Sequence, residues 1–123
     1  MKLTSLRPIL YTNQFTETLN FYTQILGFTV SERNDDWGWA SLSKDDVNIM
    51  LAIPNHHMGF EKPHFTGSFY FNVEDVEAAW AELEHKTKIC YEIETFEWGM
   101  REFAIYDNNG YILQFGQETT TYK

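Results

Sequence analysis

The sequence has little of what stabilises secreted proteins or spans membranes. Its single cysteine, Cys90, cannot form an intramolecular disulfide. No apolar run approaches the roughly 20 residues of a membrane-spanning helix, and residues 1–7 lack the apolar region of a signal peptide. We therefore expect a cytoplasmic protein that does not act at a membrane.

Basic residues are also scarce. Nine Lys and Arg residues against 18 Asp and Glu residues give a formal net charge of −9. Nucleic-acid binding depends on contacts between basic side chains and phosphates, so we expect no nucleic-acid partner. The acidic excess is ordinary for a soluble protein, and it would also favour a cationic ligand.

Aromatic residues, in contrast, are abundant. They make up 17% of the 123 residues and include tryptophans at positions 37, 39, 80 and 98. A chain of this length is typical of one domain with a sizeable hydrophobic core. Four tryptophans are more than the packing of a core alone leads us to expect.

Hydrophobic periodicity predicts two copies of one βαβββ unit. The first copy has a strand at 3–12, a helix at 14–26 capped by Asn13, and strands at 28–33, 37–43 and 47–53. The second has a strand at 68–73, a helix at 75–84, and strands at 90–96, 100–106 and 111–115. An offset of 61 residues superimposes the apolar helix positions Phe15 on Val76, Leu19 on Trp80, and Tyr22 on Leu83.

The closing stretch, 97–117, carries the most specific pattern. Two apolar-rich runs flank Asp107-Asn108-Asn109-Gly110, whose last two residues tolerate the positive φ of a tight primed hairpin turn. The Trp-Gly-x-Arg-Glu-Phe run before it, together with this spacing, resembles the last hairpin of the glyoxalase/bleomycin-resistance/extradiol-dioxygenase superfamily, also called vicinal oxygen chelate proteins. That family usually has Asp-Pro-Asp-Gly at the turn.

The resemblance covers nearly the whole chain and implies an α+β fold. Two βαβββ modules would form open, barrel-like sheets in a single domain, 1–123, with module 1 at about 3–54, a linker at about 55–66 and module 2 at about 67–118. The family commonly completes its cavities across a twofold axis, so we expect a homodimer. The fold hosts enzymes and non-catalytic binding proteins alike.

Catalytic branches of the family hold a divalent metal with His and Glu side chains. The matching positions here are Arg7, Met50, Ser68 and Gln114. These side chains do not form a hard-cation or zinc site, so we expect no metal, no cofactor and no catalytic residue. His56, His57, His64 and Glu61 cluster in the linker, and we interpret them as solvated loop residues.

The resemblance is strongest to the metal-free bleomycin-resistance branch, which sequesters planar, often cationic antibiotics. We expect a small molecule of that kind to lie in an aromatic cavity. The predicted ligand-binding residues are Arg7, Trp37, Trp39, Met50, Ser68, Tyr70, Trp98, Phe103 and Gln114. Strand alternation places Trp37 and Trp39 on one strand face, where they would either stack on a ligand or pack in a core.

Two other interpretations stay open. One is an enzyme, either a metal-independent lyase or isomerase on this scaffold or a degenerate metalloenzyme such as a dioxygenase. The other is a dimeric module without a small ligand, in which the aromatic residues bury the interface between two copies. The identity of the ligand does not follow from the sequence.

Overall fold

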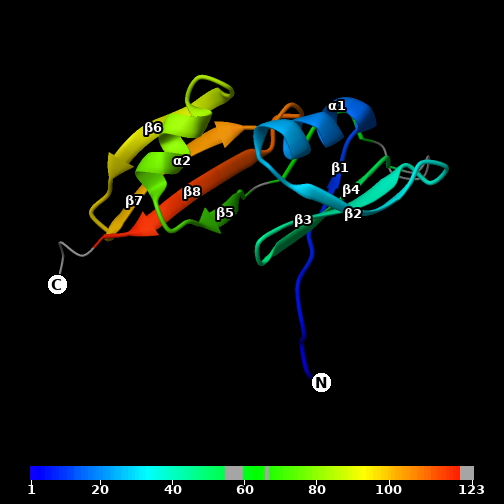
Figure 1. Cartoon of the computed structure of the whole chain (residues 1–123), viewed down its shortest axis with the longest axis horizontal. Coiled ribbons are helices and arrows are strands. Elements are labelled where there is room, and N and C mark those ends of the chain that lie inside the picture. The colour runs from blue at the N-terminus through cyan, green and yellow to red at the C-terminus, as the bar shows by residue number, and fades with distance from the viewer. Residues whose placement is uncertain (55–59, 66, 120–123) are drawn as a thin grey trace. The chain divides into compact units, whose positions relative to one another are not determined.

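The chain divides into two compact units. The computed structural model describes residues 1–54, 60–65 and 67–119. Unit 1 spans Met1–Pro63 and unit 2 spans His64–Lys123. Each unit contains a four-stranded mixed sheet and one helical segment, as Figure 1 shows. The predicted linker, 55–66, lies partly outside the described residues.

Unit 1 is the first predicted βαβββ module. It contains β1 (Ile9–Tyr11), α1 (Phe15–Asn20), the π-helical turn η1 (Phe21–Ile25), β2 (Thr29–Asn34), β3 (Trp39–Lys44) and β4 (Val47–Ala52). The sheet order is β1-β4-β3-β2, with β1 parallel to β4 and the other pairs antiparallel. Alternate strand residues and the helical segment supply the core, which includes Leu10, Leu19, Tyr22, Leu42 and Leu51.

Helix α1 begins differently from the prediction. The expected cap, Asn13, donates its side-chain amide to the Phe60 carbonyl oxygen at 2.9 Å, and no side chain caps the helix from the N-cap position, Gln14. Thr12 takes over part of this role, because its Oγ1 accepts a hydrogen bond from the Gln14 backbone N–H at 2.9 Å. The assignment of Asn13 as the cap was therefore wrong.

The turn between β2 and β3 is longer than predicted. Gly38 adopts a positive φ of 64°, and a Cβ there would lie 2.6 Å from Cδ1 of Ile53. Glycine is thus required both by conformation and by space. The turn therefore extends through Trp37, and β3 begins at Trp39, so Trp37 and Trp39 do not share a strand face as expected.

Unit 2 repeats the same architecture. It contains β5 (Phe69–Asn72), α2 (Val76–Leu83), β6 (Lys88–Thr95), β7 (Met100–Tyr106) and β8 (Ile112–Glu118). Its sheet order, β5-β8-β7-β6, matches that of unit 1, and neither sheet closes. Helices α1 and α2 begin at Phe15 and Val76, so the predicted offset of 61 residues is confirmed.

The closing hairpin has a three-residue loop rather than the tight two-residue turn. The Asp107 N–H donates to the Tyr111 carbonyl oxygen at 2.9 Å, and only Gly110 of the loop has positive φ. Oδ1 of Asp107 accepts from the backbone N–H groups of Asn109, Gly110 and Tyr111 at 2.8–2.9 Å. This carboxylate organises the loop, and the turn prediction was wrong by one residue.

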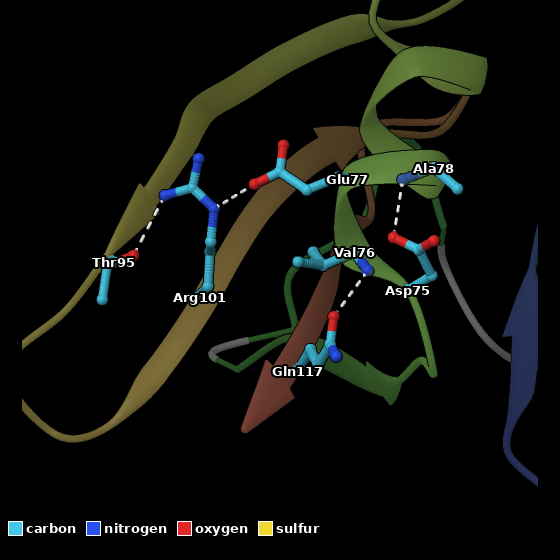
Figure 2. A network of polar contacts seen from close by, with 7 residues as sticks. All are labelled: Asp75, Val76, Glu77, Ala78, Thr95, Arg101 and Gln117. Carbon is cyan, nitrogen blue, oxygen red and sulfur yellow. Dashed lines mark hydrogen bonds and ion pairs between the residues drawn. The ribbon is translucent and has the colours of Figure 1, made fainter. Parts of the chain in front are cut away.

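Polar contacts tie α2 to its sheet, as Figure 2 shows. Asp75 caps the helix by accepting from the Ala78 N–H at 3.1 Å, and the Gln117 side chain accepts from the Val76 N–H at 2.9 Å. The Arg101 guanidinium bridges Glu77 of α2 and Thr95 of β6. These contacts lie on the helix side of the sheet.

Within the described residues, no helix is long and apolar enough to cross a membrane.

Candidate functional site

Strand alternation gives the sheet of unit 2 two different faces. On the helix side, Phe103 of β7 packs edge-on against Trp80 of α2, with ring centroids 5.1 Å apart, and stacks on Phe115 of β8 at 5.2 Å. The opposite side carries hydrogen-bonding side chains. We call this side the polar face and define it by Ser68, Tyr70, Tyr91, Glu102 and Gln114.

The strand register assembles the polar face from all four strands and the residue before β5. One row across the sheet contains Tyr70, Gln114, Ala104 and Tyr91. The adjacent row contains Asn72, Gly116 and Glu102. Residues far apart in the sequence thus lie together because neighbouring strands are hydrogen-bonded in this register.

A chain of hydrogen bonds crosses the polar face. The Ser68 hydroxyl donates to Oε1 of Gln114, and Nε2 of Gln114 donates to the Tyr91 hydroxyl oxygen at 2.8 Å. The Tyr91 hydroxyl also lies near the carboxylate of Glu102. Because the Gln114 amide donates to Tyr91, the phenol proton of Tyr91 is available for another acceptor.

Glu102 is the acidic side chain of the polar face. The Tyr70 hydroxyl donates to Oε2 of this carboxylate, whose residue is only 4% exposed. Partial burial of the hydroxyl, this hydrogen bond and the charge of Glu102 together raise the pKa of Tyr70. Burial likewise raises the pKa of Tyr91, partly offset by the hydrogen bond from Gln114. Both phenols therefore keep their protons at neutral pH.

Aromatic rings extend from the polar face to the loop between β6 and β7. Tyr91 meets Phe96 edge-on at 5.9 Å, and Phe96 stacks on Trp98 with ring centroids 4.6 Å apart and an interplanar angle of 9°. Trp98 is 61% exposed. The flat surface of the Trp98 indole is thus open to solvent, and Phe96 connects it to Tyr91 of the polar face.

The predicted ligand residues of unit 1 have varied positions. Trp39 directs its indole N–H toward the Met50 sulfur at 3.4 Å, on the side of the sheet opposite the core. Trp37 is exposed in the turn before β3, and Arg7 is exposed in the segment before β1. Of these four residues, the structure brings together only Trp39 and Met50.

In unit 2 the structure brings Ser68, Tyr70 and Gln114 together on the polar face. The ring of Phe96 lies between Trp98 and Tyr91 of that face. Phe103 is fully buried and packs in the core instead. A two-residue turn at Asn109-Gly110 would have paired it with Gly116, on the face of Gln114. The observed register pairs Phe103 with Phe115, and a shift of one residue reverses the face.

Sequence reasoning also missed three residues: Tyr91, Phe96 and Glu102. The number of residues in the loop of the last hairpin could have located Glu102. This number sets the register that buries Phe103 and turns Glu102 to the polar face. Tyr91 lies between two β-bulges in β6, so simple alternation from the strand ends does not predict its direction.

The donor set does not fit the divalent metal of the family's catalytic branches. Gln114 offers the one carbonyl oxygen among the four matching side chains, and it already accepts from Ser68. The Met50 sulfur accepts from Trp39, and Arg7 is a cation. Among the residues that the structure describes, no three His, Cys, Asp or Glu side chains are grouped to hold a metal ion. His56 and His57 lie outside those residues.

Comparison with models of known protein families identifies the superfamily of this chain. Residues 4–115 match the model of the glyoxalase/bleomycin resistance protein/dioxygenase superfamily. The chain belongs to this superfamily, as the closing hairpin and the repeated module predicted. No curated protein matches the chain in sequence.

Solved structures with this fold have low sequence identity to the chain. A glyoxalase/bleomycin resistance protein/dioxygenase from Nocardioides has a TM-score of 0.81 at 16% identity, covering 100% of this chain and 89% of that one. TioX from Micromonospora sp. ML1 has 0.76 at 16%, covering 94% and 99%. Lactoylglutathione lyase from Agrobacterium tumefaciens has 0.74 at 15%, covering 95% and 96%. At these identities the likeness establishes the fold alone.

Proposed function

We propose that the chain is a non-catalytic binding protein of the bleomycin-resistance type, which sequesters a small planar ligand. The observation that carries the proposal is the exposed Trp98 stacked on Phe96, next to the polar face of unit 2. The stack offers a flat indole surface, and the polar face offers hydrogen-bonding groups beside it. Apolar surface with a few convergent polar groups is the usual composition of a small-molecule site.

Aromatic stacking would supply much of the affinity. An offset-stacked pair contributes about 0.5–1.5 kcal/mol beyond the area that it buries. Because Phe96 already holds the Trp98 ring on one side, the ligand would meet a preorganised indole and would lose less affinity to ordering it. Trp39, held against Met50, offers a comparable surface in unit 1.

A glyoxalase-like lyase, isomerase or dioxygenase is the alternative that uses the same fold. The observation in its favour is the buried carboxylate of Glu102, which accepts a hydrogen bond from the Tyr70 phenol, since paired acids and bases perform proton transfers. The positions that would hold the catalytic metal carry unsuitable donors. Binding without turnover is therefore the better-supported function.

A homodimer without a small ligand is the other competitor. Trp37 and Trp98 are exposed in the single chain, and a second copy could cover either indole. Light scattering with and without ligand separates this possibility from ligand binding. Under the proposal, loss of the Trp98 indole changes affinity for a ligand and leaves the mass of the protein unchanged.

Replacement of Trp98 by alanine tests the proposal. The probe is acridone, an uncharged planar tricyclic compound, and its binding is followed by the polarisation of its own fluorescence. We expect Trp98→Ala to weaken acridone binding by about tenfold, which corresponds to the loss of one stacked contact of about 1.5 kcal/mol. The melting temperature should change little, because the removed ring is largely exposed.

Trp37→Ala is the matched control, because it removes an equally large exposed indole from a turn in unit 1. The control should keep the affinity of the unaltered protein. Equal losses in the two variants, or acridone binding that neither substitution affects, would count against a site at the Phe96–Trp98 stack. A Trp98→Ala variant that changes from dimer to monomer would support the interface interpretation.

A further inference from the structure

Tyr70 reaches across a neighbouring strand to meet Glu102. The sheet order places β8 between β5, which carries Tyr70, and β7, which carries Glu102. On β8 the register puts Gly116 directly beside Glu102. A Cβ at position 116 would overlap the Tyr70 hydroxyl and ring. The phenol therefore lies over bare backbone, in space that the missing side chain leaves open.

Gly116 has no conformational reason to be glycine. Its φ lies outside the left-handed region, so an alanine would fit the backbone. What it provides is room for the Tyr70 ring. The close approach of phenol and backbone makes Gly116 a positioning residue for the contact between Tyr70 and Glu102.

The charge of Glu102 is not balanced by a neighbouring cation. In the part of the chain that the structure describes, the ion pairs of Arg side chains involve Asp35 and Glu77, and none involves Glu102. The neutral Tyr70 phenol hydrogen-bonds to the carboxylate, and the Tyr91 phenol lies near it. A buried anion is costly unless it is paired as well as hydrogen-bonded. Among the described residues, the buried carboxylate of Glu102 thus has a hydrogen-bond donor but no cationic partner.

The Tyr70 ring, which lies over this carboxylate, is accessible to solvent. Tyr70 is 39% exposed although its hydroxyl contacts a carboxylate that is almost fully buried. Rotation of one exposed ring would open Glu102 to a ligand. The Tyr91 ring, whose hydroxyl lies near Glu102, connects this point to Phe96 and the exposed Trp98.

We propose that Glu102 anchors the cationic group of the ligand and that the Tyr70 ring covers this carboxylate until the ligand displaces it. This inference rests on the proposed binding function and specifies its ligand class, a planar aromatic molecule that carries a protonated nitrogen. The N–H of the cation replaces the Tyr70 hydroxyl as donor to Glu102, and the planar part extends toward the Trp98 stack. A hydrogen bond between two oppositely charged groups thus replaces one in which the donor is a neutral phenol.

Two probes of similar shape and different charge test this inference. Proflavine is a planar tricyclic cation at neutral pH, and acridone is a planar tricyclic molecule without charge. The unaltered protein should bind proflavine at least tenfold more tightly than acridone, because the cation gains a charge-assisted hydrogen bond in a partly desolvated site. Glu102→Gln should remove this preference, so that the two probes bind with similar affinity.

Glu82→Gln controls for the change in net charge, because Glu82 is exposed on α2. It should keep the preference for proflavine. Tyr70→Phe removes the hydroxyl that competes for Glu102, and Gly116→Ala displaces the ring while keeping that hydroxyl. Both substitutions should tighten proflavine binding by a few fold, because opening the cover then costs the ligand less.

The outcomes separate this inference from the proposed function. Equal affinity for the two probes, or a proflavine preference that persists in Glu102→Gln, overturns the role of Glu102, while a loss of acridone binding in Trp98→Ala still supports the stacking site. Weaker proflavine binding in both Tyr70→Phe and Gly116→Ala overturns the covering role of Tyr70. If neither probe binds, the proposed function fails and this inference fails with it.

Discussion

Replacement of Phe103 by alanine is expected to lower the free energy of unfolding of unit 2 by about 3–5 kcal/mol, the range for truncating a large buried aromatic side chain. The residue is fully buried between Trp80 and Phe115. The ring is held on two sides, so its removal leaves a cavity that the rigid β7–β8 ladder cannot close. Urea denaturation measures the loss, and hydrogen exchange of the β7 and β8 amides locates it in unit 2.

Phe103→Leu is the matched control. It keeps an apolar side chain in the same space and should cost about 1–2 kcal/mol. Phe103→Leu should also keep the affinity for acridone, because the residue lies on the opposite side of the sheet from the polar face. If Phe103→Ala left stability unchanged and weakened ligand binding, the residue would face the ligand and the register of β7 and β8 would be wrong.

Replacement of Asp107 by alanine is expected to cost about 3 kcal/mol. The Asp107 side chain is almost fully buried, and one carboxylate oxygen accepts from three backbone N–H groups in the closing loop. A hydrogen bond to a charged group contributes about 1.5–3 kcal/mol, and alanine would remove three such bonds while letting in some water as partial replacement. Thermal unfolding followed by circular dichroism measures the change.

Asp107→Asn separates the geometry of this loop from its charge. Asparagine keeps an oxygen at the same place and should cost only about 1 kcal/mol, because the three hydrogen bonds persist without the charge. Equal losses in the alanine and asparagine variants would mean that the charge rather than the acceptor geometry holds the loop. No loss in either variant would contradict the role of Asp107 in setting the hairpin register.

Much of the fold was predictable, because the pattern of each βαβββ module lies in a short stretch of sequence and occurs twice. The two helices carry their apolar residues at the same spacing, and both begin where the offset of 61 residues places them. Errors arose where side chains act on turns. Thr12 rather than Asn13 accepts from the start of α1, and Gly38 is needed next to Ile53, which lengthens the turn around Trp37.

The candidate site was less predictable, because it depends on register. Ser68 and Gln114 were located from the metal-ligand positions of the resembling family and Tyr70 from strand alternation, and the three lie together. Glu102 and Phe103 are neighbours with opposite roles, and a single residue in the last loop decides which of them faces the helix. That choice depends on three hydrogen bonds to Asp107, which no periodicity in the sequence records.

The central claim is that a planar ligand binds at the Phe96–Trp98 stack beside the polar face of unit 2. The four tryptophans each carry one indole N–H, and heteronuclear NMR resolves such groups individually. During a titration with proflavine, the Trp98 resonance should shift saturably, whereas the Trp80 resonance, from the helix side of the same sheet, should move little. A Trp98 resonance that stays fixed while proflavine binds would contradict the claim.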